Sequence, residues 1–126
     1  MAESVIDAST LLAILLSEPT TDLDALLDRA VISTVNLAEV RTKLIDLGRL
    51  DLEMIGANLL GLVRVADFTE QHAMIAAALR PATRHVGLSL GDRACLALAI
   101  ALKTDVYTAD RSWLQVSVGC EVHLIR

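Results

Sequence analysis

Short apolar runs alternate along the chain with longer segments whose hydrophobic residues recur every three or four positions. The short, often β-branched runs predict strands, and they occupy residues 5–7, 30–33, 63–68, 105–110 and 121–125. The helical spacing predicts helices over residues 11–16, 20–28, 35–47, 51–62, 70–79 and 89–103. Strands and helices are therefore expected to alternate along the sequence.

Residues that begin or end helices support several of these boundaries. Asp51 and Thr69 can cap the helices that follow them, and Gly48 is well placed just after a helix. The segment 89–103 has the strongest helical pattern, and beyond Arg93 it is apolar on all sides, which predicts a buried helix body. Its polar first turn must then emerge at an edge of the domain.

This order of elements predicts an α/β fold with a central parallel sheet of four to five strands and helices on both faces. Right-handed crossovers place the carboxyl ends of such strands along one edge of the sheet, where ligands of open α/β sheets bind. Asp7 ends the first predicted strand and Asp110 ends the fourth. We therefore expect both carboxylates at that edge.

The composition is that of one domain with a well-filled core. The chain has 126 residues, of which 54% are hydrophobic, and we expect residues 1–126 to form a single domain. No apolar run approaches the roughly 20 residues that span a bilayer, and the opening MAESVID lacks the features of a signal peptide. We expect a cytoplasmic protein with no membrane partner. Cys95 and Cys120 lack the spacing of a zinc site, so we expect buried thiols.

The charge restricts how nucleic acid could bind. A net charge of −5 argues against broad affinity for a phosphate backbone. One Phe, one Tyr and one Trp also offer little surface on which bases could stack. If nucleic acid is the substrate, binding must be local or carried by metal ions.

Two more acids can reach the same edge of the sheet. Glu39 lies early in the helix after the second strand, and it shares a face with Asn36 and Lys43. Asp92 lies in the first turn of the buried helix, where Gly91 removes side-chain bulk beside it. The acids expected to border one crevice, without an obvious basic partner for each, are Asp7, Glu39, Asp92 and Asp110.

Each acid also has a structural interpretation that the sequence leaves open. Asp7 suits an Asx turn or a helix cap, and Asp110 can cap a short helix. Asp92 can form a capping box with Ser89, and Glu39 taken alone suits a solvated surface. The case for a functional site rests on the four acids occurring together.

Clustered carboxylates repel one another, and a divalent cation relieves that repulsion. Oxygen ligands without histidine or cysteine spacing favour Mg²⁺ or Mn²⁺ over Zn²⁺. One or two such ions can hold a phosphodiester and activate a water, and they would supply the positive charge that the chain lacks.

The segments VIDAST, STVNLAEV, LSLGDRACLALA and YTADRSW, in this order and at this spacing, resemble the PIN-domain ribonucleases. The likeness is greatest to the VapC-type toxins of bacterial toxin–antitoxin pairs, and the closing VHLIR is similar to the end of such toxins. It covers essentially the whole chain, and SLGDRACLALA with TADRSW is its specific part. The chain departs from the pattern in a short first strand that contains Glu3 and Ser4.

The resemblance implies a PIN-like three-layer sandwich and a Mg²⁺- or Mn²⁺-dependent endoribonuclease that cleaves RNA with a metal-activated water. It implies that the catalytic and metal-binding residues are Asp7, Glu39, Asp92 and Asp110. The polar residues near the site, with a role in substrate binding, would be Ser9, Asn36 and Ser112. It also implies a homodimer, and a hetero-oligomer with a cognate VapB-type antitoxin that occupies the active-site groove.

Basic residues near the predicted edge could hold RNA phosphates, and a solvated or salt-bridged role is equally open for each. They are Arg41, Lys43, Arg84, His85, Arg93 and Arg111. We expect structural roles for His72 and His123, and we expect Trp113 to anchor the short helix after Asp110.

Other functions match parts of the pattern. A receiver-like regulatory domain would need an acidic pair at the first strand, where only Asp7 stands. A phosphatase of the DxD type would need a second aspartate where Ser9 stands. A PIN-like protein that lacks catalysis and acts through partner binding is also compatible with the sequence.

Overall fold

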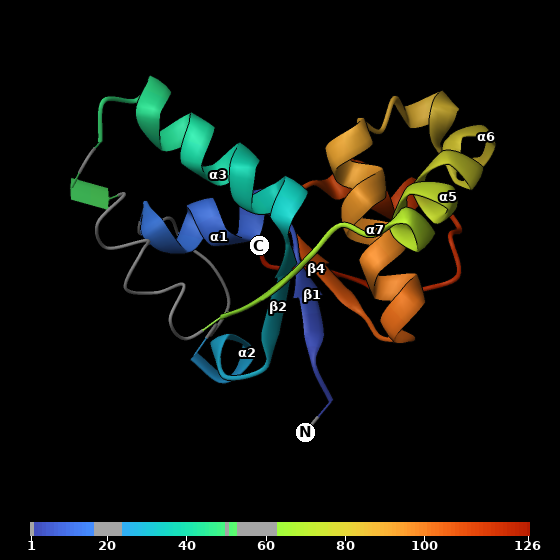
Figure 1. Ribbon diagram of the computed structural model, residues 1–126, viewed down its shortest axis with the longest axis horizontal. Helices are drawn as coiled ribbons and strands as arrows, with labels where there is room; N and C mark the ends of the chain where they lie inside the picture. Colours follow the sequence, from blue (N-terminus) through green and yellow to red (C-terminus); the bar gives the residue numbers. More distant parts are fainter. Residues whose placement is uncertain (1, 17–23, 50, 53–62) are drawn as a thin grey trace.

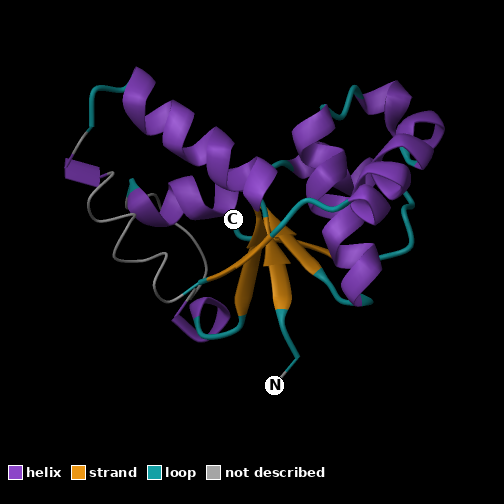
Figure 2. Cartoon of the chain, viewed as in Figure 1, coloured by secondary structure: helices purple, strands orange, loops and turns teal. Residues whose placement is uncertain are grey.

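The structure is a computed structural model that describes residues 2–16, 24–49, 51–52 and 63–126 (Figures 1 and 2). Its strands form one parallel sheet in the order β3-β2-β1-β4-β5. Their bounds are Ser4–Ile6 for β1, Ala30–Ser33 for β2, Arg64–Ala66 for β3, Val106–Thr108 for β4 and Val122–Leu124 for β5. The predicted fold class and all the predicted strands are confirmed, although the strands are only three or four residues long.

The described helices pack against both faces of this sheet. Their bounds are Ala8–Leu15 for α1, Asp24–Leu27 for α2, Thr34–Asp46 for α3, Glu70–Ala78 for α5, Arg80–Thr83 for α6 and Leu90–Leu102 for α7. Two 3₁₀ helices, η1 (Arg84–Val86) and η2 (Arg111–Gln115), follow α6 and β4. Figure 1 shows α1 and α3 on one side of the strands and α5, α6 and α7 on the other, so the molecule has three layers.

Side chains alternate between the two faces along each strand, and each face therefore has its own apolar core. Ile6 and Ile32 belong to the core beneath α1 and α3, together with Leu11 and Leu44. Val5, Val31 and Val106 belong to the other core, where they pack with residues of α7. The body of α7 is buried from Ala94 to Ala99, as its uniformly apolar pattern predicts.

α1 begins at Ala8 instead of the predicted Leu11, because Asp7 caps it. The helix predicted over 70–79 ends as α5 at Ala78, and a separate short helix, α6, begins at Arg80 with Pro81 in its first turn, where the missing N–H breaks no helical hydrogen bond. The predicted helix over 51–62 lies outside the described residues except for Asp51 and Leu52, and so do the first residues of the one over 20–28.

Both cysteines are free thiols, and Cys95 is buried as expected, whereas Cys120 is only partly buried. Burial raises the pKa of the Cys95 thiol well above its usual range and that of Cys120 to about 11. In the described part of the chain, no helix has the length and apolar composition needed to cross a membrane.

Candidate functional site

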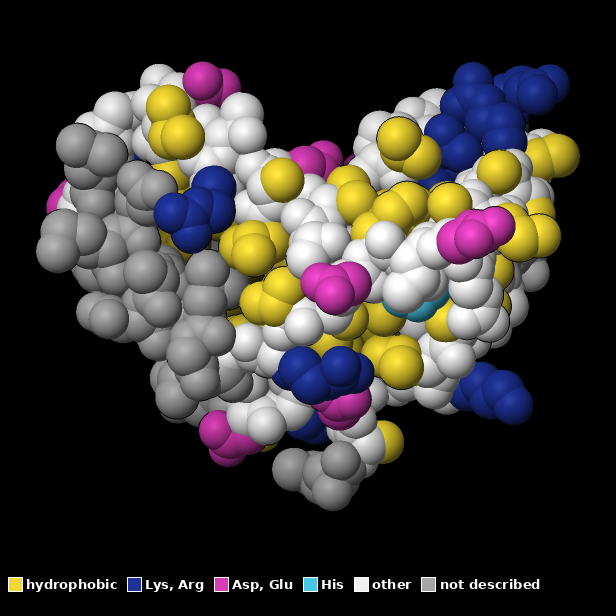
Figure 3. Space-filling model, viewed as in Figure 1, with side chains coloured by type: hydrophobic (Ala, Val, Ile, Leu, Met, Phe, Trp, Pro, Cys, Tyr) yellow, Lys and Arg dark blue, Asp and Glu magenta, His cyan; other side chains and the backbone are white. Residues whose placement is uncertain are grey.

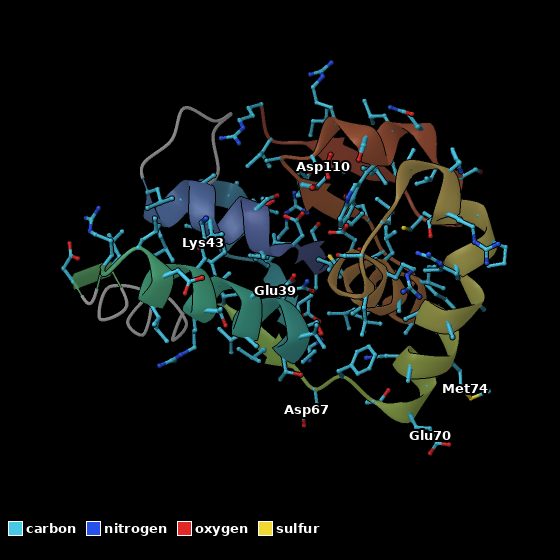
Figure 4. The ribbon with its side chains drawn as sticks, turned by 90° about the horizontal axis from the view of Figure 1, so that it is seen from above. Glu39, Lys43, Asp67, Glu70, Met74 and Asp110 are labelled. Atoms are coloured by element: carbon cyan, nitrogen blue, oxygen red, sulfur yellow. The ribbon has the colours of Figure 1, made fainter. Side chains whose placement is uncertain are left out.

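Neighbouring parallel strands end at the same edge of the sheet, and the helices that follow them begin there. β1 leads into α1, β2 into α3 and β4 into η2, and β1 lies between β2 and β4. Figure 3 shows the surface hollowed between the part formed by α3 and the part formed by α5, α6 and α7, with acidic side chains at its floor. Figure 4 looks onto this edge, which Glu39 and Asp110 both border.

Asp7 follows β1 directly and is 5% exposed. Its carboxylate accepts hydrogen bonds from Ser9 Oγ (2.7 and 2.9 Å), from the Thr10 backbone N–H (2.9 Å) and from Thr108 Oγ1 (2.6 Å). Desolvation raises the pKa of Asp7, and these hydrogen bonds oppose that rise. The Thr10 contact makes Asp7 the N-cap of α1, but capping alone does not require a carboxylate to be buried.

Glu39 extends from α3 to the start of α7. Its Oε1 accepts a hydrogen bond of 2.7 Å from Asn36 Nδ2, and a Cβ added at Gly91 would lie 2.5 Å from its Oε2. Desolvation raises the pKa of the Glu39 carboxyl, the Asn36 hydrogen bond opposes this, and the charges of Asp92 and Asp7 raise it further. Glu39 is exposed at this edge, and the negative charges of both aspartates disfavour its ionised form.

Asp92 forms the capping box that the sequence leaves open. Its Oδ2 accepts a hydrogen bond of 3.0 Å from the Ser89 backbone N–H, and its own N–H donates to Ser89 Oγ at 3.1 Å. Oδ1 accepts no hydrogen bond from the residues that the structure describes. One oxygen of Asp92 therefore starts the helix while the other is available for a ligand.

Asp110 is exposed and caps η2, with Oδ1 accepting from the Ser112 backbone N–H at 2.9 Å. Its own N–H donates to Thr108 Oγ1 at 3.0 Å, and that hydroxyl in turn donates to Asp7. The buried Thr108 side chain thus links Asp110 to Asp7.

Thr108 was not predicted from the sequence. The feature of the sequence that could have pointed to Thr108 is its position at the end of β4, two residues before Asp110. Its role, however, depends on the pairing of β4 with β1. A buried hydroxyl at that position points to the carboxylate that follows the neighbouring strand.

The chemistry of these side chains suits a hard divalent cation. The donors are carboxylate oxygens, Gly91 leaves the space in which the Glu39 carboxylate lies, and Asn36 Oδ1 is buried without a partner among the described residues. Among the described residues, however, no three Asp, Glu, His or Cys side chains are positioned to hold one ion together. Holding a cation would require the exposed carboxylates to turn toward Asp7.

The structure places the remaining predicted polar and basic residues differently. Ser9 and Asn36 both bond to acids of the edge, whereas Ser112 meets Asp110 through its backbone. Lys43 is exposed one turn beyond Glu39 on α3 (Figure 4), and Arg111 is exposed beside Asp110.

Arg93 is committed to a contact within the fold. Its Nη1 donates to the carbonyl of Ala76 in α5 at 2.9 Å, so the side chain joins α7 to α5. In this rotamer the guanidinium holds the fold together, in keeping with the structural interpretation that the sequence leaves open.

A cavity of about 520 Å³ lies at the opposite edge of the sheet, beside the first residues of β1 and the end of α7. None of the four predicted acids lines it. Three of its lining residues bond to one another, because Ser4 Oγ donates to Asp105 Oδ1 at 2.6 Å and accepts from Arg29 Nη1, and Asp105 Oδ2 also lies 3.0 Å from His123 Nε2. This network is structural, and the acidic edge is the better candidate for chemistry.

The model of one protein family, the PIN domain, matches residues 4–119 of the chain. A search of curated protein sequences found no match to this chain. Several solved structures share its fold at low sequence identity.

One similar chain belongs to VapBC2 from Rickettsia felis bound to a DNA fragment from its promoter, with 15% identity, a TM-score of 0.81 and 98% of each chain covered. Another belongs to DNA-bound VapBC from Salmonella typhimurium, with 16% identity, a TM-score of 0.79 and the same coverage. A third belongs to VapBC-5 from Mycobacterium tuberculosis, a member of the VapBC family of toxin–antitoxin systems. It has 22% identity and a TM-score of 0.70, and the match covers 100% of this chain and 99% of the other.

Proposed function

The chain belongs to the PIN-domain family, and from this premise we propose that it is a VapC-type toxin, a Mg²⁺- or Mn²⁺-dependent endoribonuclease folded as a single domain over residues 1–126. The observation that supports the proposal is that strand ends and helix starts bring Asp7, Glu39, Asp92 and Asp110 to one edge of the sheet, where the Glu39 carboxylate lies against Gly91. Burial raises the pKa of Asp7, and desolvation together with the charges of Asp92 and Asp7 raises that of Glu39. Carboxylates with perturbed pKa values cluster at functional sites.

The four acidic side chains would hold the metal ion. Asp7, whose carboxylate is held by three donors, would bind the ion together with Glu39, Asp92 and Asp110. A bound Mg²⁺ or Mn²⁺ supplies Lewis acidity that activates water and neutralises charge on the phosphodiester. Asp92 can offer its free oxygen while its other oxygen maintains the capping box.

RNA would be held locally on this acidic protein. Lys43 and Arg111 are exposed on two sides of the edge and can each contact a phosphate, whereas Arg93 would first have to leave its contact with Ala76. Ser9 is committed to Asp7, and Ser112 offers its hydroxyl next to Asp110. We assign phosphate contact to Lys43 and Arg111 ahead of Arg93.

The proposed partners are a cognate VapB-type antitoxin and a second copy of the chain. The similar structures described above are toxin–antitoxin complexes by name, which supports an antitoxin partner. The proposed location is the cytoplasm, where such a toxin meets RNA.

A specific observation favours a second candidate, a PIN-domain protein without catalysis that acts by binding a partner. Asp7 and Asp110 each cap a helix, Asp92 completes the capping box of α7, and among the described residues no metal-binding group of three is assembled.

RNA cleavage by the purified protein separates the two candidates. We expect cleavage with Mg²⁺ or Mn²⁺, none with EDTA, and loss of cleavage in Asp7→Ala and Asp92→Asn. Asp46→Asn, which changes an exposed acid at the end of α3, is the matched control and should cleave normally. Cleavage that survives EDTA would refute the metal mechanism, and metal binding without cleavage of any RNA would favour the second candidate.

A further inference from the structure

Asn36 lies between α3 and α7 beneath the acidic edge and is 1% exposed. Its Nδ2 donates to Glu39 Oε1 at 2.7 Å and to the Gly91 carbonyl at 3.0 Å. Both partners accept hydrogen bonds only, so the opposite orientation of the amide would turn its oxygen toward two acceptors. The two contacts therefore fix which end of the amide faces Glu39.

The contact is built into the packing of the two helices. Gly91 is buried, and a Cβ there would lie within 2.5–2.7 Å of three Glu39 carboxylate atoms. The Asn36 amide therefore holds the Glu39 carboxylate by a hydrogen bond, and the absence of a side chain at Gly91 leaves the space that this carboxylate occupies. Without the amide, the end of this exposed, flexible side chain would have no donor from the described residues.

Asn36 also bears a cost that a purely structural residue would avoid. Its Oδ1 is buried and has no partner in the described part of the chain. A buried acceptor left unpaired is unfavourable, and apolar side chains fill such positions more cheaply. The amide makes a contact with the neighbouring carboxylate that an apolar side chain could not make.

We infer that Asn36 is a positioning residue, which holds Glu39 on the first turn of α7 and thereby sets the geometry of the acidic edge, instead of contacting substrate. The catalytic consequence of this inference rests on the proposed function. The hydrogen bond by which Asn36 holds Glu39, here called the clamp, does not depend on it. It also replaces the substrate-binding role that the family resemblance implies for Asn36.

Unfolding in metal-free buffer tests the clamp without reference to metal or RNA. A double-mutant cycle of Asn36→Ala and Glu39→Ala, followed by urea denaturation, should give a coupling of roughly tenfold in the unfolding equilibrium constant, as a hydrogen bond to a charged group provides. A coupling near unity would overturn the inference. This readout stands even if the protein binds no metal and cleaves no RNA, in which case only the proposed function fails.

Metal titration and steady-state kinetics test the positioning role. Asn36→Ala should weaken Mn²⁺ affinity by about 10–100-fold, the range expected for removing a partner of a metal ligand, and should lower kcat with little change in KM. Asn36→Asp, which keeps the shape but replaces the donor with an acceptor, should behave like Asn36→Ala. Gln71→Ala, an exposed amide on α5, should match wild type. A raised KM with unchanged kcat and Mn²⁺ affinity would mean that Asn36 contacts RNA and would overturn the inference.

Discussion

Gly91→Ala should leave the protein as stable as wild type or slightly more stable, and yet impair its site. Alanine in a helix is favoured over glycine by roughly 0.5–1 kcal/mol. The added Cβ would lie 2.5 Å from Glu39 Oε2, whereas ordinary contact begins at 3.4 Å, so the carboxylate must move by roughly 0.9 Å. Because Glu39 is a flexible and exposed side chain, this movement costs little energy, but it strains the 2.7 Å hydrogen bond from Asn36.

A shift of this size exceeds the tolerance of about 0.5 Å that preorganised sites require. We expect Gly91→Ala to weaken Mn²⁺ affinity and to slow RNA cleavage by about 10–100-fold. Urea denaturation gives the stability, and isothermal titration and a cleavage assay give the site properties. In a Glu39→Ala background the carboxylate and its hydrogen bond from Asn36 are absent, so the same substitution should be at least as favourable for stability and should cause no further loss of metal affinity.

Two results would refute this reasoning. Wild-type metal affinity and cleavage in Gly91→Ala would mean that Glu39 is not needed on the first turn of α7. A loss of more than about 1 kcal/mol of stability in both backgrounds would mean that the Cβ meets something other than the Glu39 carboxylate.

Other perturbations test the same edge. Because desolvation raises the folded-state pKa of Asp7, the metal-free protein should lose stability as the pH rises from the unfolded-state pKa of this carboxyl through its folded-state pKa. Asp7→Asn should flatten this pH dependence of stability in urea melts at pH 4–8. An unchanged dependence on pH would contradict the assignment to Asp7. Thr108→Val should lower the free energy of unfolding by about 1.5–3 kcal/mol, the value of a hydrogen bond to a charged group, whereas Thr108→Ser should retain most of it; equal losses in both would implicate packing instead. Mn²⁺ should raise the melting temperature more at pH 7 than at pH 5, because protons compete for the raised carboxyls; a pH-independent shift would place the ion elsewhere.

The positions of Asp7 and Asp110 could be predicted because they depend on strand ends alone. Parallel strands joined by helices bring their carboxyl ends to one edge, and a run that stops at an aspartate fixes where that acid lies. The sheet and its helical layers follow from the same pattern, as does the buried body of α7.

Other parts of the edge depend on packing that no local pattern encodes. Asn36, Glu39 and Gly91 meet only because α3 crosses the start of α7, and the sequence spacing shows no more than a shared helix face. The contact of Arg93 with α5 is a choice of rotamer, which spacing does not determine. The role of Thr108 requires knowing that β4 lies beside β1.

The strand order also determines when during synthesis the acidic edge can form. β1 is made first but lies in the middle of the sheet, and its partner β4 follows about a hundred residues later, as the separation of 101 between Asp7 and Thr108 shows. A nascent chain therefore cannot assemble this edge until β4 has left the ribosome. A chain that ends after α7 should lack metal-dependent activity even if its helices form, which a cleavage assay on the truncated protein can check. On the proposed function, the ribonuclease would therefore stay inactive until β4 has been synthesised and can pair with β1.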